Sequence, residues 1–188
     1  MLIQSNTPDT AERYNFKYLK YPFSPFKHQR KVFERIYHSN ILLESPTSSG
    51  KTAAVVYPIV DQVQDSNCRA LFIYPTRALL WDQYQTISRV ASEVSLGVAK
   101  IDPYTPTKDL YGIFARNRII AMTPDIFYLT LLRNAQHYKR FYEKAVESIS
   151  HIVFDEVHLY DTYMLFNLRN LIMIIREINS EIRIHCLS

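Results

Sequence analysis

The chain has 188 residues, of which 47% are hydrophobic and 21% are charged, with a net charge of +4 and a pI near 9.0. This composition excludes a disordered or fibrous protein and predicts one globular domain with a sizeable core. The mild positive charge favours an anionic partner, although an ordinary solvated surface would explain it equally well.

Cysteine usage and hydropathy exclude further classes. Cys68 and Cys186 are the only cysteines, and their spacing indicates neither a disulfide framework nor a zinc site. The N-terminus has no basic segment followed by an apolar one, and no apolar run reaches the ~20 residues that span a bilayer. We therefore expect a cytoplasmic protein without a membrane partner.

The order of apolar segments predicts the fold class. Residues 1–25 are polar and aromatic, and Pro22 and Pro25 oppose regular structure, so we expect an extended lead-in. In 26–188, short apolar strands alternate with helices, which predicts an α/β domain with a mostly parallel sheet and helices on both faces. The expected helices are 27–37, 50–64, 78–91, 107–115, 125–134 and 164–178, and the expected strands are 41–43, 70–74, 96–100, 118–122, 151–155 and 183–187.

The segment SPTSSGKT, residues 45–52, follows the strand 41–43 and opens a helix, as a phosphate-binding loop does. Lys51 can bind the β and γ phosphates, and the Thr52 hydroxyl can bind Mg²⁺. Ser45 stands where the general pattern has glycine, so a structural turn remains the alternative for the loop alone. The predicted nucleotide-binding residues here are Pro46, Thr47, Ser48, Ser49, Gly50, Lys51 and Thr52.

Two carboxylates end the strand 151–155. Asp155 and Glu156 stand where a phosphate-loop enzyme places the acid that orients Mg²⁺. Two acids at a buried strand end are costly without a cation, although a solvated turn is the alternative. We assign Asp155, with Thr52, to Mg²⁺, and Glu156 to polarising the water that attacks the γ phosphate. Lys51, Asp155 and Glu156 are thus the predicted catalytic residues.

Four segments occur in the order and rough spacing of a known family: PTSSGKT at 46–52, YPTRAL at 74–79, TPD at 123–125 and DEVH at 155–158. From about residue 26 to its end, the chain resembles the first helicase lobe of superfamily 2, in its DExH branch. The resemblance implies a RecA-like domain that uses ATP and Mg²⁺ in a nucleic-acid-dependent ATPase. Serine is ordinary at the first loop position in that superfamily, so Ser45 does not weaken the match.

The resemblance also implies roles for individual residues. Gln29 matches the glutamine that reads adenine, with a helix-surface role as the alternative, and His158 matches the histidine that links the nucleotide and nucleic-acid sites. Two stretches match those that hold the backbone of a single strand without reading its sequence. They are Pro75, Thr76 and Arg77, and Thr123, Pro124 and Asp125, where Thr123 could also simply cap a helix.

Other aromatic and basic residues have weaker interpretations. Trp81 and Tyr84 could stack on bases, but their helical spacing with apolar neighbours favours a contact with the core or with another domain. Arg116 and Arg118 could extend a basic track, but a solvated turn is favoured for both.

Within the superfamily, the segment 155–171, DEVHLYDTYMLFNLRNL, looks most like the helicase of type I CRISPR systems in the form without a fused nuclease domain. This implies antiviral defence, single-stranded DNA, and a CRISPR effector complex or nuclease subunit as partners. The alternatives are the large-helicase-related branch in DNA repair and a docking module that does not hydrolyse ATP. Ser188 matches the first residue of the family's Ser-Ala-Thr stretch, so we expect a motor truncated before its second lobe, with the isolated lobe inactive.

Overall fold

The computed structural model of the chain describes residues 2–3, 13–46, 49–130 and 139–188. Seven strands form one sheet in the order β1-β2-β7-β6-β3-β5-β4, and every neighbouring pair runs parallel. They are β1 (Leu2–Ile3), β2 (Ile41–Leu43), β3 (Arg69–Ile73), β4 (Val98–Lys100), β5 (Ile119–Met122), β6 (Ile149–Phe154) and β7 (Arg183–Leu187). The predicted parallel α/β fold is therefore confirmed.

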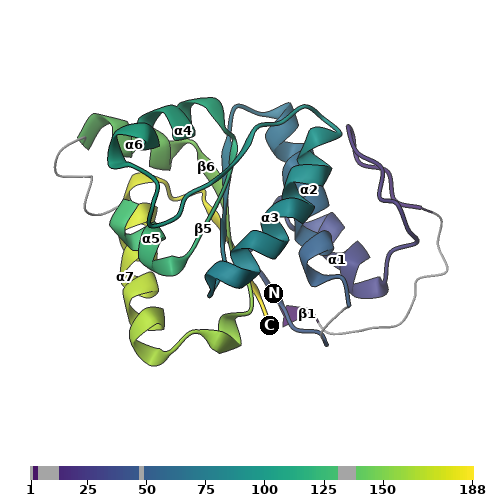
Figure 1. Cartoon of the computed structure of the whole chain (residues 1–188). Coiled ribbons are helices and arrows are strands. Elements are labelled where there is room, and N and C mark those ends of the chain that lie inside the picture. Colours follow the sequence, from purple (N-terminus) through teal and green to yellow (C-terminus); the bar gives the residue numbers. More distant parts are fainter. Residues whose placement is uncertain (1, 4–12, 47–48, 131–138) are drawn as a thin grey trace.

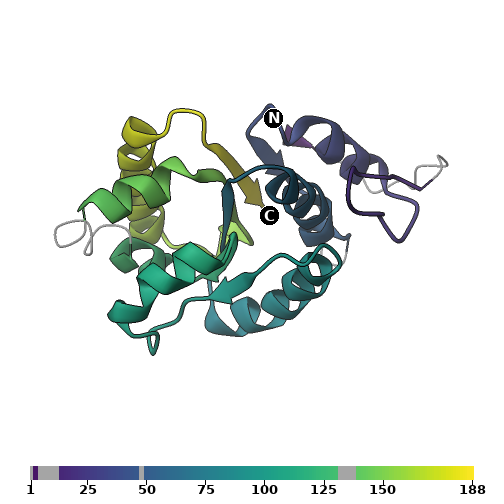
Figure 2. The ribbon, with the colours of Figure 1, turned by 90° about the horizontal axis from the view of Figure 1, so that it is seen from above.

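Helices cover both faces of the sheet, as Figures 1 and 2 show from two directions. One face carries α1 (Lys27–Arg35), α2 (Lys51–Asp65) and α3 (Arg77–Ser92). The other carries α4 (Leu110–Arg116), α5 (Pro124–Tyr128), α6 (Lys139–Glu147) and α7 (Thr162–Ile178). Each layer encloses its own cluster of buried apolar side chains. Among the described helices, none is long and apolar enough to cross a membrane.

The structure differs from the prediction at three elements. The expected helix 125–134 is observed as α5, Pro124–Tyr128, and residues 131–134 lie outside the described residues. A helix not predicted, α6, precedes β6. The strand β1 also was not predicted, and it pairs with β2 at the edge of the sheet. Two residues are too short for the alternation of apolar and polar side chains that reveals a strand.

The lead-in is packed into the domain, which the sequence did not predict. No helix forms within 13–25, as expected, but Phe16 and Tyr21 pack edge-on against Phe33 of α1. The buried carboxylate of Asp61 on α2 accepts hydrogen bonds from three successive backbone N–H groups of the segment. The donors are Lys17 at 3.2 Å, Tyr18 at 2.6 Å and Leu19 at 3.0 Å. Residues 13–25 therefore belong to the same packed core as α1 and α2.

A pair of buried histidines joins β6, β7 and α2. His151 Nδ1 lies 2.8 Å from His185 Nε2, and His151 Nε2 lies 2.7 Å from Gln62 Oε1. Because an amide oxygen only accepts, His151 donates to Gln62 and accepts from His185. Burial, together with the charge of the nearby Arg183, lowers the pKa of His151 to about 3. Burial also lowers the pKa of His185, so both rings are neutral in the folded state.

This pair predicts a pH dependence of stability. The unfolded chain protonates both imidazoles below about pH 6.5, whereas the folded chain does not, so the free energy of unfolding should fall as the pH decreases from 6.5 toward 4. Each ring contributes up to about 1.4 kcal/mol per pH unit. Replacing both rings, by His151→Gln with His185→Leu, should reduce this slope in urea unfolding measurements made at several pH values.

The exposed His38 provides the control, because His38→Gln should leave the slope as in the wild type. Asp155 has a folded pKa raised to about 6, so its contribution has the opposite sign, but it is present in every variant and cancels in the comparison. An unchanged slope in the double variant would show that the two buried rings do not set the acid sensitivity.

Candidate nucleotide and nucleic-acid site

The predicted loop and the predicted acid pair meet at the carboxyl end of the sheet, where the parallel strands terminate. The loop follows β2 and the acids follow β6, with β7 between these strands. Since all three strands are parallel, their carboxyl ends lie at the same edge, where ligands bind in such sheets. The Thr52 hydroxyl lies 3.4 Å from Asp155 Oδ2, across 103 positions of sequence. The structure thus brings together the two halves of the site.

The loop has the backbone shape that its glycine requires. Gly50, the residue before α2, has φ +77°, in the left-handed region, and a Cβ at that position would collide with the amide nitrogen of Gln29. Ser45 is not in the left-handed region, so a side chain is tolerated there. Its hydroxyl lies 2.6 Å from the hydroxyl of Ser49. Thr47 and Ser48 lie outside the described residues.

Lys51 lies in the first turn of α2 and is only 7% exposed. Its ammonium group donates to the backbone oxygen of Ser45 at 2.8 Å and approaches that of Pro46 at 3.4 Å. The positive charge is therefore held against the loop itself. A charge in this position can move from neutral carbonyl oxygens to phosphate oxygens, which form stronger charge-assisted hydrogen bonds.

Asp155 is 5% exposed. Its pKa is raised to about 6, first by burial and then by the charge of Glu156. The hydrogen bonds from Glu156 N–H and Thr52 and the charge of Lys51 oppose this increase. The oxygen donors of this site fit a metal ion. A buried carboxylate beside a hydroxyl is the small set of protein ligands that Mg²⁺ uses when phosphates and water complete its coordination.

Glu156 has an unusual backbone conformation, with φ 49° and ψ 49°. This left-handed conformation is uncommon for a residue with a side chain, and such strain is concentrated at functional sites. The Glu156 carboxylate lies 3.4 Å from His158 Nδ1, which is also 3.2 Å from the hydroxyl of Ser188 at the end of β7. His158 therefore bridges the acidic segment and the neighbouring strand end, next to the nucleotide loop.

Gln29 occupies the predicted place beside the loop. Its amide nitrogen donates to the backbone oxygen of Gly50 at 3.1 Å, and its amide oxygen accepts from the backbone N–H of Phe26 at 2.9 Å. It is 2% exposed, so the alternative of a helix-surface glutamine is wrong. Gln29 ties the start of α1 to the phosphate loop.

The two segments predicted to hold nucleic acid differ in accessibility. Pro75 is half-buried, and Thr76 and Arg77 are exposed at the carboxyl end of β3, where the Thr76 hydroxyl accepts from Leu79 N–H at 3.3 Å. After β5, the side chains of Thr123 and Pro124 are buried and that of Asp125 is exposed. The Thr123 hydroxyl donates to the Asp125 carboxylate and makes no side-chain cap to α5. Thr123 is therefore the N-cap residue of α5, as the alternative expected, but its side chain does not cap the helix.

The structure decides the roles of several other residues. The Arg118 side chain donates to the backbone oxygens of Val63 and Ser66 at the end of α2, at 3.0 and 2.7 Å. It therefore caps the C-terminus of α2 and is not a solvated turn residue. Tyr84 packs against the core as predicted. Trp81 is 51% exposed, so it does not belong to the core of this domain, and its predicted contact with another domain stays a prediction. Helical spacing could not separate the two aromatics because both lie on α3.

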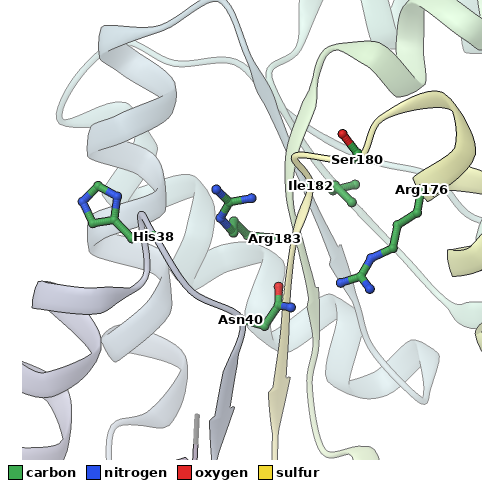
Figure 3. A pocket seen from close by; sticks show the side chains of 6 residues that line it. All are labelled: His38, Asn40, Arg176, Ser180, Ile182 and Arg183. Carbon is green, nitrogen blue, oxygen red and sulfur yellow. The ribbon is translucent and has the colours of Figure 1, made fainter.

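A separate cavity of about 310 Å³ lies at the opposite end of the strands, where β2 and β7 begin (Figure 3). It is lined by His38, Asn40, Arg176, Ser180, Ile182 and Arg183. These residues precede β2 and β7 or end α7, whereas the phosphate loop follows β2. The cavity therefore takes no part in the nucleotide site.

The chain is similar to known helicases in fold and in sequence. In a solved structure with the DUF1998 helicase MrfA bound to DNA and AMPPNP, the matching chain has a TM-score of 0.74 and 24% identity over 87% of this chain and 24% of that chain. The likeness shows a shared fold. The DEAD/DEAH box helicase family matches residues 26–188, and the chain belongs to that family.

The chain matches only part of the length of two curated relatives. It is 27% identical to the ATP-dependent helicase hrq1 of Schizosaccharomyces pombe over 72% of this chain and 13% of that protein. It is 27% identical to the ATP-dependent helicase YprA of Bacillus subtilis over 72% of this chain and 18% of that protein. The chain thus spans less than a fifth of the length of these curated relatives.

Proposed function

We propose that this domain is the first motor lobe of an ATP-dependent helicase or translocase that acts on nucleic acid. The observation that carries the proposal is the 3.4 Å approach of the Thr52 hydroxyl to Asp155 at the carboxyl edge of the sheet. A phosphate loop and an acidic strand end that converge in this way form a site for a nucleoside triphosphate.

Each residue of the site has a role in this proposal. Lys51 and the backbone of the loop bind the phosphates, and Thr52 and Asp155 would hold Mg²⁺. When bound, Mg²⁺ neutralises charge that develops on the phosphates. Glu156, directed by its left-handed backbone, polarises the attacking water, and His158 couples it to the end of β7. Gln29 favours adenine through its amide.

The nucleic acid would lie beside the nucleotide, over the ends of β3 and β5. Thr76 and Arg77 are exposed there and offer a hydroxyl and a guanidinium to phosphate oxygens. After β5 the side chains of Thr123 and Pro124 are buried, so we infer that any contact of these two residues is made by their backbone. DNA is the proposed substrate, since the MrfA structure named above contains it.

We infer that the domain belongs to a DNA helicase without a specific role in a CRISPR system. Hrq1, YprA and MrfA are described as helicases without reference to a CRISPR system, so a CRISPR effector complex or nuclease subunit as partner rests on the segment 155–171 alone. The branch of large-helicase-related repair enzymes fits these relatives at least as well. A cytoplasmic location remains part of the proposal.

Thermal melting with nucleotide tests the proposal. With Mg²⁺ and a non-hydrolysable ATP analogue at about 100 times its Kd, binding should stabilise the fold by about 2.7 kcal/mol, which corresponds to a rise in Tm of roughly 5 to 10 °C. A GTP analogue should give a smaller rise, and Gln29→Ala should reduce the response to ATP. Gln83→Ala, on the surface of α3, is the control and should respond like the wild type. No rise at millimolar nucleotide would favour the docking module instead.

A further inference from the structure

Two large aromatic side chains are exposed close to the proposed nucleic-acid track. Trp81, in the second turn of α3, is 51% exposed, and Tyr104, in the turn after β4, is 76% exposed. Each ring has a cation over one face. Lys100 Nζ lies 3.1 Å from the centre of the Trp81 ring, and Arg77 Cζ lies 5.3 Å from the centre of the Tyr104 ring. These four residues form what we call the aromatic patch.

The aromatic patch is held in place by the turn that carries Tyr104. Asp102 forms an ion pair with Lys100 at 3.2 Å and accepts hydrogen bonds from Tyr104 N–H at 3.0 Å and the Thr105 hydroxyl at 3.2 Å. The Lys100 side chain is only 13% exposed, so its charge is covered by Trp81 and Asp102. Lys100 therefore supports the indole and is not itself free to reach a phosphate.

The position of the patch connects it to the track. Arg77 and Trp81 are four residues apart in α3, so they lie on one face of the helix about 5 to 6 Å apart at Cβ. Arg77 directly follows Thr76 at the carboxyl end of β3, and Tyr104 follows the carboxyl end of β4. The patch therefore lies at the carboxyl ends of the strands, as the nucleotide site does. Because the strand order is β2-β7-β6-β3-β5-β4, the patch lies on the side of the nucleotide site toward β4.

We propose that the aromatic patch is a stacking platform for the bases of a single-stranded nucleic acid. The inference rests on the proposed function, because it takes the strand whose backbone Thr76 and Arg77 would hold. Exposed rings next to a cationic backbone track are the combination that single-strand-binding proteins use, with one base stacked on each ring. The platform accepts any base, since every base has a flat face. The exposed guanidinium of Arg77, over the Tyr104 ring, favours a strand that carries phosphates over a protein partner.

The intrinsic fluorescence of the chain tests the platform, because Trp81 is its only tryptophan. The chain should be titrated with a thymidine 15-mer and with an abasic 15-mer that has the same backbone without bases. Both oligonucleotides should bind through the backbone contacts. Stacking predicts that the thymidine strand quenches Trp81 emission and binds more tightly, whereas the abasic strand leaves the emission unchanged.

Variants separate stacking from a structural effect. Because Trp81→Ala has no tryptophan emission, its binding is measured by the fluorescence anisotropy of labelled oligonucleotides; the variant should bind the thymidine strand about fivefold to 150-fold more weakly and the abasic strand like the wild type. Trp81→Phe should restore most of the affinity because phenylalanine also stacks. Tyr104→Ala should weaken binding in the same direction. Tyr111→Ala removes an exposed tyrosine from α4, on the other face of the sheet, and should have no effect.

The outcomes distinguish this inference from the proposed function. If the thymidine strand binds without quenching Trp81, and Trp81→Ala binds both strands like the wild type, the platform is overturned while the backbone track survives. If neither strand binds the wild-type chain, the track is overturned and the platform with it. The platform is supported if the thymidine strand quenches Trp81 and the abasic strand does not, and if Trp81→Ala binds the thymidine strand more weakly.

Discussion

Replacing Lys51 with alanine should lower the affinity for an ATP analogue by about ten- to hundredfold and remove most of the nucleotide-induced rise in Tm. The ammonium group is nearly buried and lies 2.8 Å from the Ser45 backbone oxygen, at the loop that would receive the phosphates. A hydrogen bond to a charged group is worth about 1.5 to 3 kcal/mol, and no neighbouring side chain on the loop can replace this charge. Calorimetric titration of the analogue with Mg²⁺ measures the loss.

The comparison must use the nucleotide-induced change and not the Tm of the variant alone. Removing a nearly buried lysine can itself change the stability of the unliganded fold in either direction. Lys31→Ala, an exposed lysine on α1, is the matched control and should bind like the wild type. Equal affinity in wild type and Lys51→Ala would show that the loop does not bind phosphates.

The position of the nucleotide site could be predicted from the sequence, because it depends on two recognisable strands and on their parallel direction. Once the strands 41–43 and 151–155 were predicted to run parallel, the residues after them had to lie at one edge, and the 3.4 Å contact of Thr52 with Asp155 confirms that. The identity of the strand between them could not be predicted. That β7 separates β2 and β6, and so brings Ser188 to His158, depends on long-range pairing that periodicity does not encode.

Accessibility was the property that sequence predicted least well. Trp81 and Tyr84 share one helix and a similar pattern, yet the indole of Trp81 faces outward over Lys100. Thr123 matches a nucleic-acid contact, but its side chain is buried where β5 leads into α5. The hydrogen bonds of the segment 13–25 to Asp61 also left no periodic signal, because they are donated by backbone N–H groups, which every residue except proline has.

Glu156→Gln in the full-length protein should leave ATP binding near the wild-type level and reduce the rate of hydrolysis by about 10²- to 10⁴-fold. The amide keeps the volume of the side chain and can still contact His158, 3.4 Å from the carboxylate. It cannot accept a proton from water at neutral pH, so only the step that needs a base is affected. Turnover should be measured with saturating ATP and single-stranded DNA, alongside analogue binding.

Two further variants make the result specific to Glu156. Glu181→Gln changes an exposed acid that lies before β7, at the other edge of the sheet, and should hydrolyse ATP like the wild type. Asp155→Asn should instead weaken nucleotide binding in a Mg²⁺-dependent way, because this carboxylate lies beside Thr52. The two acids would then be separated into a binding role and a catalytic role. Wild-type turnover in Glu156→Gln would contradict that division, since a base that can be removed without loss is not the group that activates the water.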